Sequence, residues 1–165
     1  MPPHEWVIFI SLFPLKIIET MDAVHLHLAV NHVPIIGSLF GLITLAVGMI
    51  LRNGTIERTG LVALAIAGIS CLPAYFSGEE AEHAVEEIVH ASHDELEEHE
   101  EHATLTLTLM LLAAAMSIAV LLSYRFFPSI KNAVLIATLL VGISAFVSSI
   151  PLALHGGKII HTELR

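Results

Sequence analysis

The stretch 103–123, ATLTLTLMLLAAAMSIAVLLS, decides the fold, because it runs for 21 residues without one charged side chain. A helix needs roughly 20 apolar residues to cross the hydrocarbon core of a bilayer. Three further stretches reach or approach that length, at 29–51, 60–76 and 132–154. Backbone polar groups find no water in lipid, so the spanning segments of so short a chain must be helices. The sequence therefore predicts an all-α integral membrane protein, an up-down bundle of four helices.

The composition excludes several classes of protein. Hydrophobic residues make up 55% of the chain and charged residues 14%, against roughly 25% charged residues in soluble domains. Residues 1–165 are one domain's length of chain, and its seven Lys and Arg residues form no basic patch for nucleic acid. Cys71 is the only cysteine, which excludes an internal disulfide, a CxxC redox pair, a CxxCH haem attachment and a Cys-ligated iron–sulfur cluster.

The basic residues predict an orientation. Arg52 and Arg58 bracket the first short connection and Arg125 and Lys131 the third, whereas the long connection 77–102 has neither Lys nor Arg. Cytoplasmic loops carry the excess of Lys and Arg. We expect a bacterial inner membrane protein with both termini and the long connection on the periplasmic side.

The first 22 residues are expected to form an interfacial arm. Their apolar run is broken by Pro14, and it has no basic leader or small-residue cleavage site. A segment lying in the membrane interface, with Trp6 and Lys16 at headgroup depth, fits this pattern.

The segment 77–102 is acidic and rich in histidine, and it has helical character. Eleven of the 16 acidic residues of the chain lie between Glu79 and Glu101. Ser92 followed three residues later by Glu95 is a capping box, which predicts a helix that begins at about His93 and runs into the third span. We expect the second span, despite Pro73, either to kink or to continue into this segment. Helical extensions should therefore stand on the outer face.

All histidines except His4 belong to this outer end. His32, preceded by Asn31, lies about one turn inside the first span, where an ionisable residue indicates function and normally faces the bundle interior. After the fourth span, Gly156-Gly157 would let the backbone approach a planar cofactor, or would simply stop the helix.

Four motifs carry a resemblance over most of the chain from about Met21 onward. They are His25-Leu-His27-Leu-Ala-Val-Asn31-His32-Val-Pro34-Ile-Ile-Gly37, the turn 77–82 (SGEEAE), His99-Glu100-Glu101-His102-Ala103, and Gly156-Gly157-Lys158-Ile-Ile-His161-Thr-Glu163. This pattern resembles a family of four-helix bacterial membrane proteins of unknown function that are often associated with c-type cytochromes. The resemblance implies a redox setting. The matching positions are His27, Asn31, His32, Pro34, Glu80, Glu82, His99, Glu100, His161 and Glu163.

The first functional hypothesis is a membrane electron-transfer subunit that binds haem b near the outer face. Two histidines on different helices can ligate one iron from both sides in an apolar pocket. The expected pair is His32 with His102 or His99, and His27 with His161 is a second pair. Asn31, Gly156 and Gly157 would contact the cofactor. If a quinol is oxidised nearby, the proton acceptors would be Glu80, Glu82, Glu98 and Glu163.

Two alternatives stay open. A non-haem iron, zinc or copper ion suits an imidazole cluster, and Glu80-x-x-His83 has the spacing used in di-iron bundles. The metal ligands would then be drawn from His27, His32, His99, His161, Glu80, Glu82 and His83. The other alternative is a structural or pH-responsive subunit without a cofactor. The haem hypothesis places the chain in a respiratory or photosynthetic complex, with other membrane subunits and a c-type cytochrome as expected partners. We expect a redox or accessory role rather than catalysis.

Overall fold

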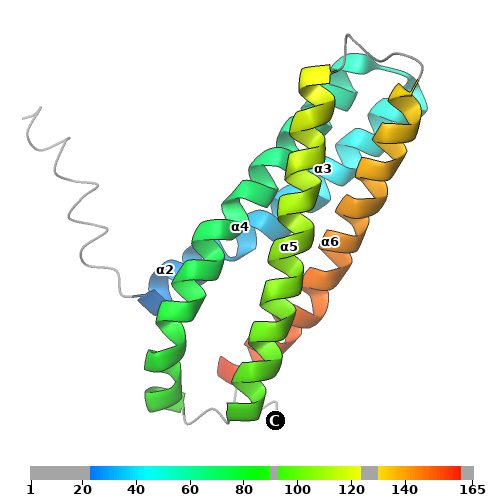
Figure 1. The fold of residues 1–165 in the computed structure, drawn as a ribbon. Helices are drawn as coiled ribbons and strands as arrows, with labels where there is room; N and C mark the ends of the chain where they lie inside the picture. The colour runs from blue at the N-terminus through cyan, green and yellow to red at the C-terminus, as the bar shows by residue number, and fades with distance from the viewer. Residues whose placement is uncertain (1–22, 90–92, 124–129, 161–165) are drawn as a thin grey trace, which may run out of the picture.

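The computed structural model describes residues 23–89, 93–123 and 130–160, and in these ranges the chain is an all-α bundle (Figure 1). The expected interfacial segment 1–22 lies outside the described residues. The helices are α2 (Ala23–Val30), α3 (His32–Leu51), α4 (Gly54–Val89), α5 (His93–Ser123) and α6 (Lys131–Ile160). Helices α2 and α3 together form the first arm of the bundle, and successive arms run antiparallel. The predicted fold class is confirmed.

Four stretches within the described residues are long and apolar enough to cross a membrane, at 25–51, 54–79, 93–123 and 131–159. Their outward faces carry large apolar side chains, among them Ile50 (79% exposed), Leu122 (75%) and Leu140 (59%). In water such a surface would be an aggregation liability, whereas in a bilayer it is the surface that lipid covers. The chain is therefore a membrane protein.

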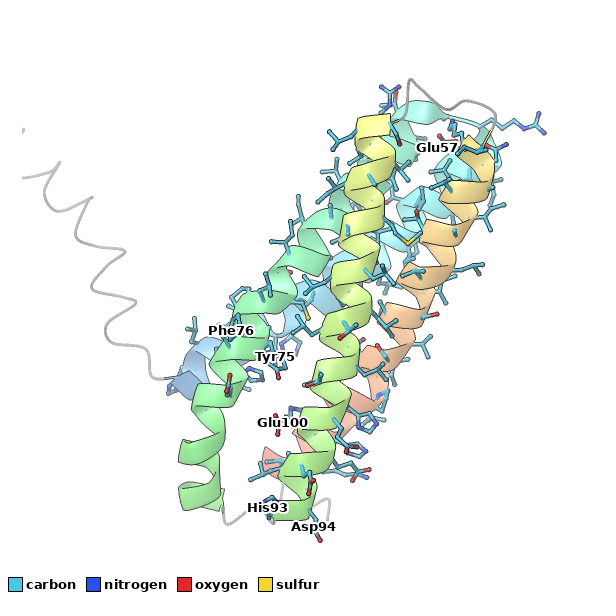
Figure 2. The ribbon with its side chains drawn as sticks, viewed as in Figure 1. Glu57, Tyr75, Phe76, His93, Asp94 and Glu100 are labelled. Carbon is cyan, nitrogen blue, oxygen red and sulfur yellow. The ribbon has the colours of Figure 1, made fainter. Side chains whose placement is uncertain are left out.

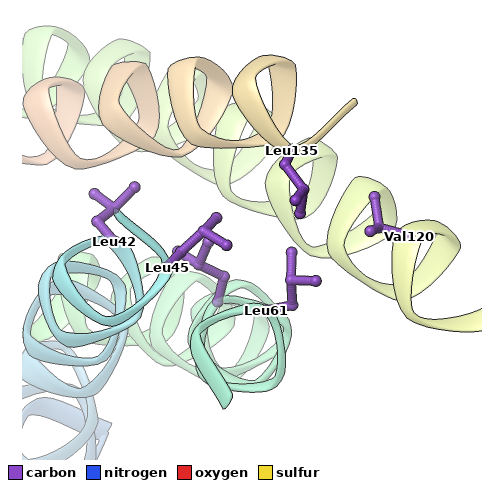
Figure 3. Close-up of a cluster of buried hydrophobic side chains, with 6 residues drawn as sticks. Leu42, Leu45, Leu61, Val120 and Leu135 are labelled. Atoms are coloured by element: carbon purple, nitrogen blue, oxygen red, sulfur yellow. The ribbon is translucent and has the colours of Figure 1, made fainter. Parts of the chain in front are cut away.

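The two ends of the bundle differ in packing. The α3–α4 connection marks one end, called here the hairpin end, and the α4–α5 connection marks the other, called here the histidine end. The main core cluster lies toward the hairpin end and joins all four arms (Figure 3). Its buried members are Leu42, Leu45, Leu61, Leu64, Val120 and Leu135.

A tight connection between α3 and α4 fixes the hairpin end. Arg52 adopts a left-handed conformation (φ 53°), and its N–H reaches the carbonyls of the last turn of α3. The side-chain Oδ1 of Asn53 accepts hydrogen bonds from the N–H groups of Thr55 (3.0 Å) and Ile56 (3.3 Å), and so caps α4.

A buried ion pair ties α6 to the same end. Lys131 Nζ lies 2.7 Å from the carboxylate of Glu57, which is almost fully buried (Figure 2). The sequence placed Lys131 at this end of the bundle and gave no sign of its partner.

Proline explains how the first arm departs from a single helix. Helix α2 ends at Val30 and α3 begins at His32, with Asn31 between them. Pro34 has no N–H to offer the carbonyl of Val30 four residues earlier, and its ring crowds that carbonyl. Asn31 keeps helical dihedrals, so the arm continues in the same general direction, but its side chain makes no capping hydrogen bond.

The other helix ends follow the sequence in part. Helix α5 begins at His93, as the capping box predicts. Helix α4 is 36 residues long and passes through Pro73 to Val89, which confirms the expected extension beyond the second span. Helix α6 runs through Gly156 and Gly157 to Ile160, so the simple helix stop expected at these glycines is wrong. Two glycines do not end a helix whose neighbouring turns are held by tertiary packing.

Candidate functional site

A cavity of about 420 Å³ lies among the helices at the histidine end. Its wall is mainly apolar, and each arm of the bundle contributes to it. In Figure 1 the ribbons of α4 and α5 diverge toward this end, and Figure 2 shows Tyr75 and Glu100 in the space between them. Both residues line the cavity, as does Glu79. A volume of this order is typical of sites for organic ligands and cofactors.

His27 of α2 is held in one orientation at the cavity wall. Its Nδ1 lies 2.9 Å from the carbonyl oxygen of Ala74 on α4, and 3.5 Å from the hydroxyl of Ser77. A carbonyl only accepts, so Nδ1 carries the hydrogen and Nε2 keeps its lone pair. Histidines that ligate metals are usually oriented in this way, by a second-shell carbonyl on the other ring nitrogen.

Gly78 lets the His27 ring lie directly against α4. A Cβ added at this glycine would stand 3.0 Å from Cε1 of the imidazole. Any larger residue would push the ring away, so the absence of a side chain here is part of how the ring is held.

His99 of α5 is the second imidazole at the cavity. Its Nδ1 is buried and has no hydrogen-bond partner. Gly156 of α6 provides the same close approach that Gly78 gives to His27, because an added Cβ would lie 3.1 Å from Cε1 of His99. His27 lies close enough to interact electrostatically with His99. At Gly157, by contrast, an added Cβ would meet nothing within 4 Å.

Three buried polar atoms in the described part of the chain lack a hydrogen-bond partner, and all three belong to residues of the cavity wall. They are Asn31 Oδ1, His99 Nδ1 and Thr106 Oγ1. Each such atom costs roughly 1–3 kcal/mol when nothing replaces the lost water. Their gathering around one cavity indicates a site for an occupant that satisfies them.

The structure separates the predicted cofactor residues into two groups. His27, Asn31, His32, His99, Gly156 and Gly157 all line the cavity. The side chain of His32 is nevertheless exposed. It precedes the buried Pro34 by two residues, which is roughly 200° around a helix, so His32 lines the cavity without being buried as Pro34 is.

His102 does not line the cavity. Its Nδ1 donates to the carbonyl of Glu98 (2.8 Å), and its ring stacks on His155 of α6 with centroids 4.9 Å apart. The carboxylate of Glu98 lies 3.6 Å from Nδ1 of His155. His27, His32 and His99 therefore all lie at the cavity, and of the two partners expected for His32 it is His99, and not His102, that lines the same cavity.

Several predicted residues are not described. His161 and Glu163 lie outside the described residues, and the side chains of Glu80, Glu82 and His83 on α4 are likewise not described. Among the residues that are described, no group of three or more His, Cys, Asp or Glu side chains could hold a metal ion.

Sequence reasoning missed Tyr75, Ser77 and Thr106. The spacing of Thr106 could have identified it, because it follows His99 by seven residues and therefore shares its face of the helix.

No family model, curated protein or solved structure matches this chain. The fold and the cavity therefore define its class directly. It is a four-helix membrane protein with an apolar, histidine-bearing cavity at one end of the bundle.

Proposed function

We propose that this cavity binds haem b between His27 and His99, and that the chain is an electron-transfer subunit. The observation that carries the proposal is that two imidazoles from different arms, those of His27 and His99, line one apolar, ligand-sized cavity. Haem iron takes two axial ligands from the protein in such bundles. When bound, the haem would supply one-electron transfer.

A haem would need only two histidines from the protein, whereas zinc takes three or four protein ligands. A zinc, copper or iron ion held with Glu80, Glu82, His83 or His161, whose side chains lie outside the described ones, is the alternative. The proposal takes one member from each of the two expected histidine pairs, His99 and His27, and joins them in one site.

The chain's own residues would hold and tune the group. The hydrogen bond from His27 Nδ1 to the Ala74 carbonyl fixes the ring and would make Nε2 a more basic ligand for iron. The apolar wall excludes water, which is one of the factors that set a haem potential.

We further propose the setting that the sequence indicated. The histidine end would face the periplasm of a bacterial inner membrane, and the subunit would exchange electrons with a quinol, a c-type cytochrome and other membrane subunits. Glu79 and Glu100, both exposed at the cavity wall, are better placed to accept protons than Glu98, whose carboxylate lies beside His155.

The test is a pyridine haemochrome spectrum with metal analysis on the protein purified in detergent. We expect a haem b spectrum from the parent chain and its loss in His27→Ala and in His99→Ala. His93→Ala is the matched control, since the side chain of His93 is 87% exposed on the same helix as His99, and it should retain the haem. A double variant of His27 and His99 with full haem content would contradict the proposal, as would zinc or copper bound in place of porphyrin.

A further inference from the structure

The cavity continues well below the two imidazoles. Thr106 follows His99 by seven residues on α5, which places it about 10 Å nearer the hairpin end at 1.5 Å per residue. On α4, Cys71 precedes Gly78 by seven residues and lies about as far below the ring of His27. Both Thr106 and Cys71 line the cavity, and Cys71 packs with the buried Met110. We call the part lined by Cys71, Thr106, Met110 and Ile35 the deep compartment.

The hydroxyl of Thr106 is exceptional among the buried hydroxyls. Those of Ser117, Thr138 and Ser149 donate to carbonyls of their own helices at 2.6–2.9 Å. Thr106 is 2% exposed, and its Oγ1 has no partner. Since a threonine in a helix can usually reach the carbonyl one turn back, a hydroxyl that does not is available to something in the cavity.

A second unpartnered atom lies at an intermediate depth. Asn31 follows His27 by four residues along the first arm, about 6 Å deeper, and its Oδ1 is buried without a partner. The cavity therefore presents a free hydroxyl in the deep compartment, that of Thr106, and an acceptor oxygen about one turn above it, that of Asn31, on an otherwise apolar wall. An occupant that fits this pattern is a lipophilic ring with oxygen atoms on opposite sides. Its route of entry passes side chains such as Leu28, which line the cavity and are exposed where lipid would lie.

We propose that this part of the cavity binds the headgroup of a lipophilic quinol, with one of its oxygens accepting a hydrogen bond from the Thr106 hydroxyl and its other hydroxyl donating to Oδ1 of Asn31. A role of this site in electron transfer rests on the proposed function, but quinol binding itself does not need the haem. The two proposals can therefore fail separately.

The test uses haem-free protein in detergent with decylubiquinol as the probe, kept under argon. Binding is measured by equilibrium dialysis. We expect saturable binding in the parent chain. Thr106→Val keeps the side-chain shape and should weaken binding about tenfold, as expected for one lost hydrogen bond.

Two further variants complete the design. Thr106→Ser restores the hydroxyl and should recover most of the affinity. Thr108→Val is the matched control, because Thr108 is exposed and its hydroxyl donates to the Thr104 carbonyl outside the cavity. Equal affinity in the parent chain and Thr106→Val would overturn the proposal, as would the absence of saturable binding. Thr106-dependent binding in a chain that never takes up haem would support this site while contradicting the proposed function.

Discussion

The adjacent glycines of α6 allow a test of how the ring of His99 is held. Gly156→Ala places a methyl group 3.1 Å from the Cε1 atom of His99, whereas Gly157→Ala places one where nothing lies within 4 Å. The two variants differ by one position in the same helix turn. Their comparison therefore isolates the contact with the imidazole from the general effect of alanine on a helix.

The two variants are expected to change the stability of the protein in opposite directions. Replacing glycine by alanine inside a helix stabilises it by up to about 1 kcal/mol, which in a chain of this length raises the Tm by roughly 2–4 °C. Gly157→Ala should show this gain. In Gly156→Ala the ring of His99 must move by a few tenths of an ångström, and such overpacking costs about 1–3 kcal/mol. That variant should be no more stable than the parent chain, and its haem affinity should fall about tenfold for each 1.4 kcal/mol of strain.

The assay is thermal unfolding in detergent, followed by helical circular dichroism, together with haem titration of the haem-free protein. A rise in Tm for Gly157→Ala without a rise for Gly156→Ala is the expected result. Unchanged haem absorption in Gly157→Ala and a shifted or weakened spectrum in Gly156→Ala would tie the effect to His99. Identical stability and identical haem binding in the two variants would refute the reasoning.

Two other predictions concern the hairpin end and are measured as free energies of unfolding. Asn53→Ala removes the cap of α4 and should cost about 1 kcal/mol, whereas Asn53→Asp should keep most of the stability; equal losses in both would show that the side-chain oxygen is not the cause. Lys131→Met removes the ammonium group 2.7 Å from the buried Glu57 carboxylate and should cost on the order of 3 kcal/mol. The double variant Glu57→Gln with Lys131→Met should cost less than Lys131→Met alone, and a larger loss in the double variant would contradict the ion pair's assigned role.

The sequence predicted the fold well because hydrophobicity and capping are local properties. The run 103–123 contains its own evidence for a span, and Ser92 with Glu95 locates the start of α5 without any knowledge of the neighbouring helices. The choice among histidines is different. His99 and His102 are three residues apart, and which of them faces the cavity depends on how α5 is rotated against α4 and α6. That rotation is set by distant contacts, such as Gly156 against the ring of His99.

His32 shows the same limit on the first arm. Its position inside an apolar run predicts an inward side chain, yet Pro34, Ser38 and Leu42 form the buried face of α3 and leave His32 exposed, although it still lines the cavity. The neighbouring Asn31 precedes Pro34 by three residues and therefore shares its inward face. Local rules located the polar residues at the right depth, and only tertiary packing decided their direction.

The same physical contrast explains why the bundle is hollow at one end. Toward the hairpin end, glycines bring helices into contact: a Cβ at Gly48 would stand 2.5 Å from the backbone of Glu57. At the level of the cavity, Pro34, Pro73 and Pro151 occur in three of the four arms, and each removes a helix hydrogen bond and favours a bend. The helices of a membrane bundle are held together by close packing rather than by the exclusion of water. An empty space between them therefore loses packing contacts that stabilise the bundle. A cavity bordered by His27, His99 and the unpartnered Thr106 is therefore better explained by an occupant than by imperfect packing.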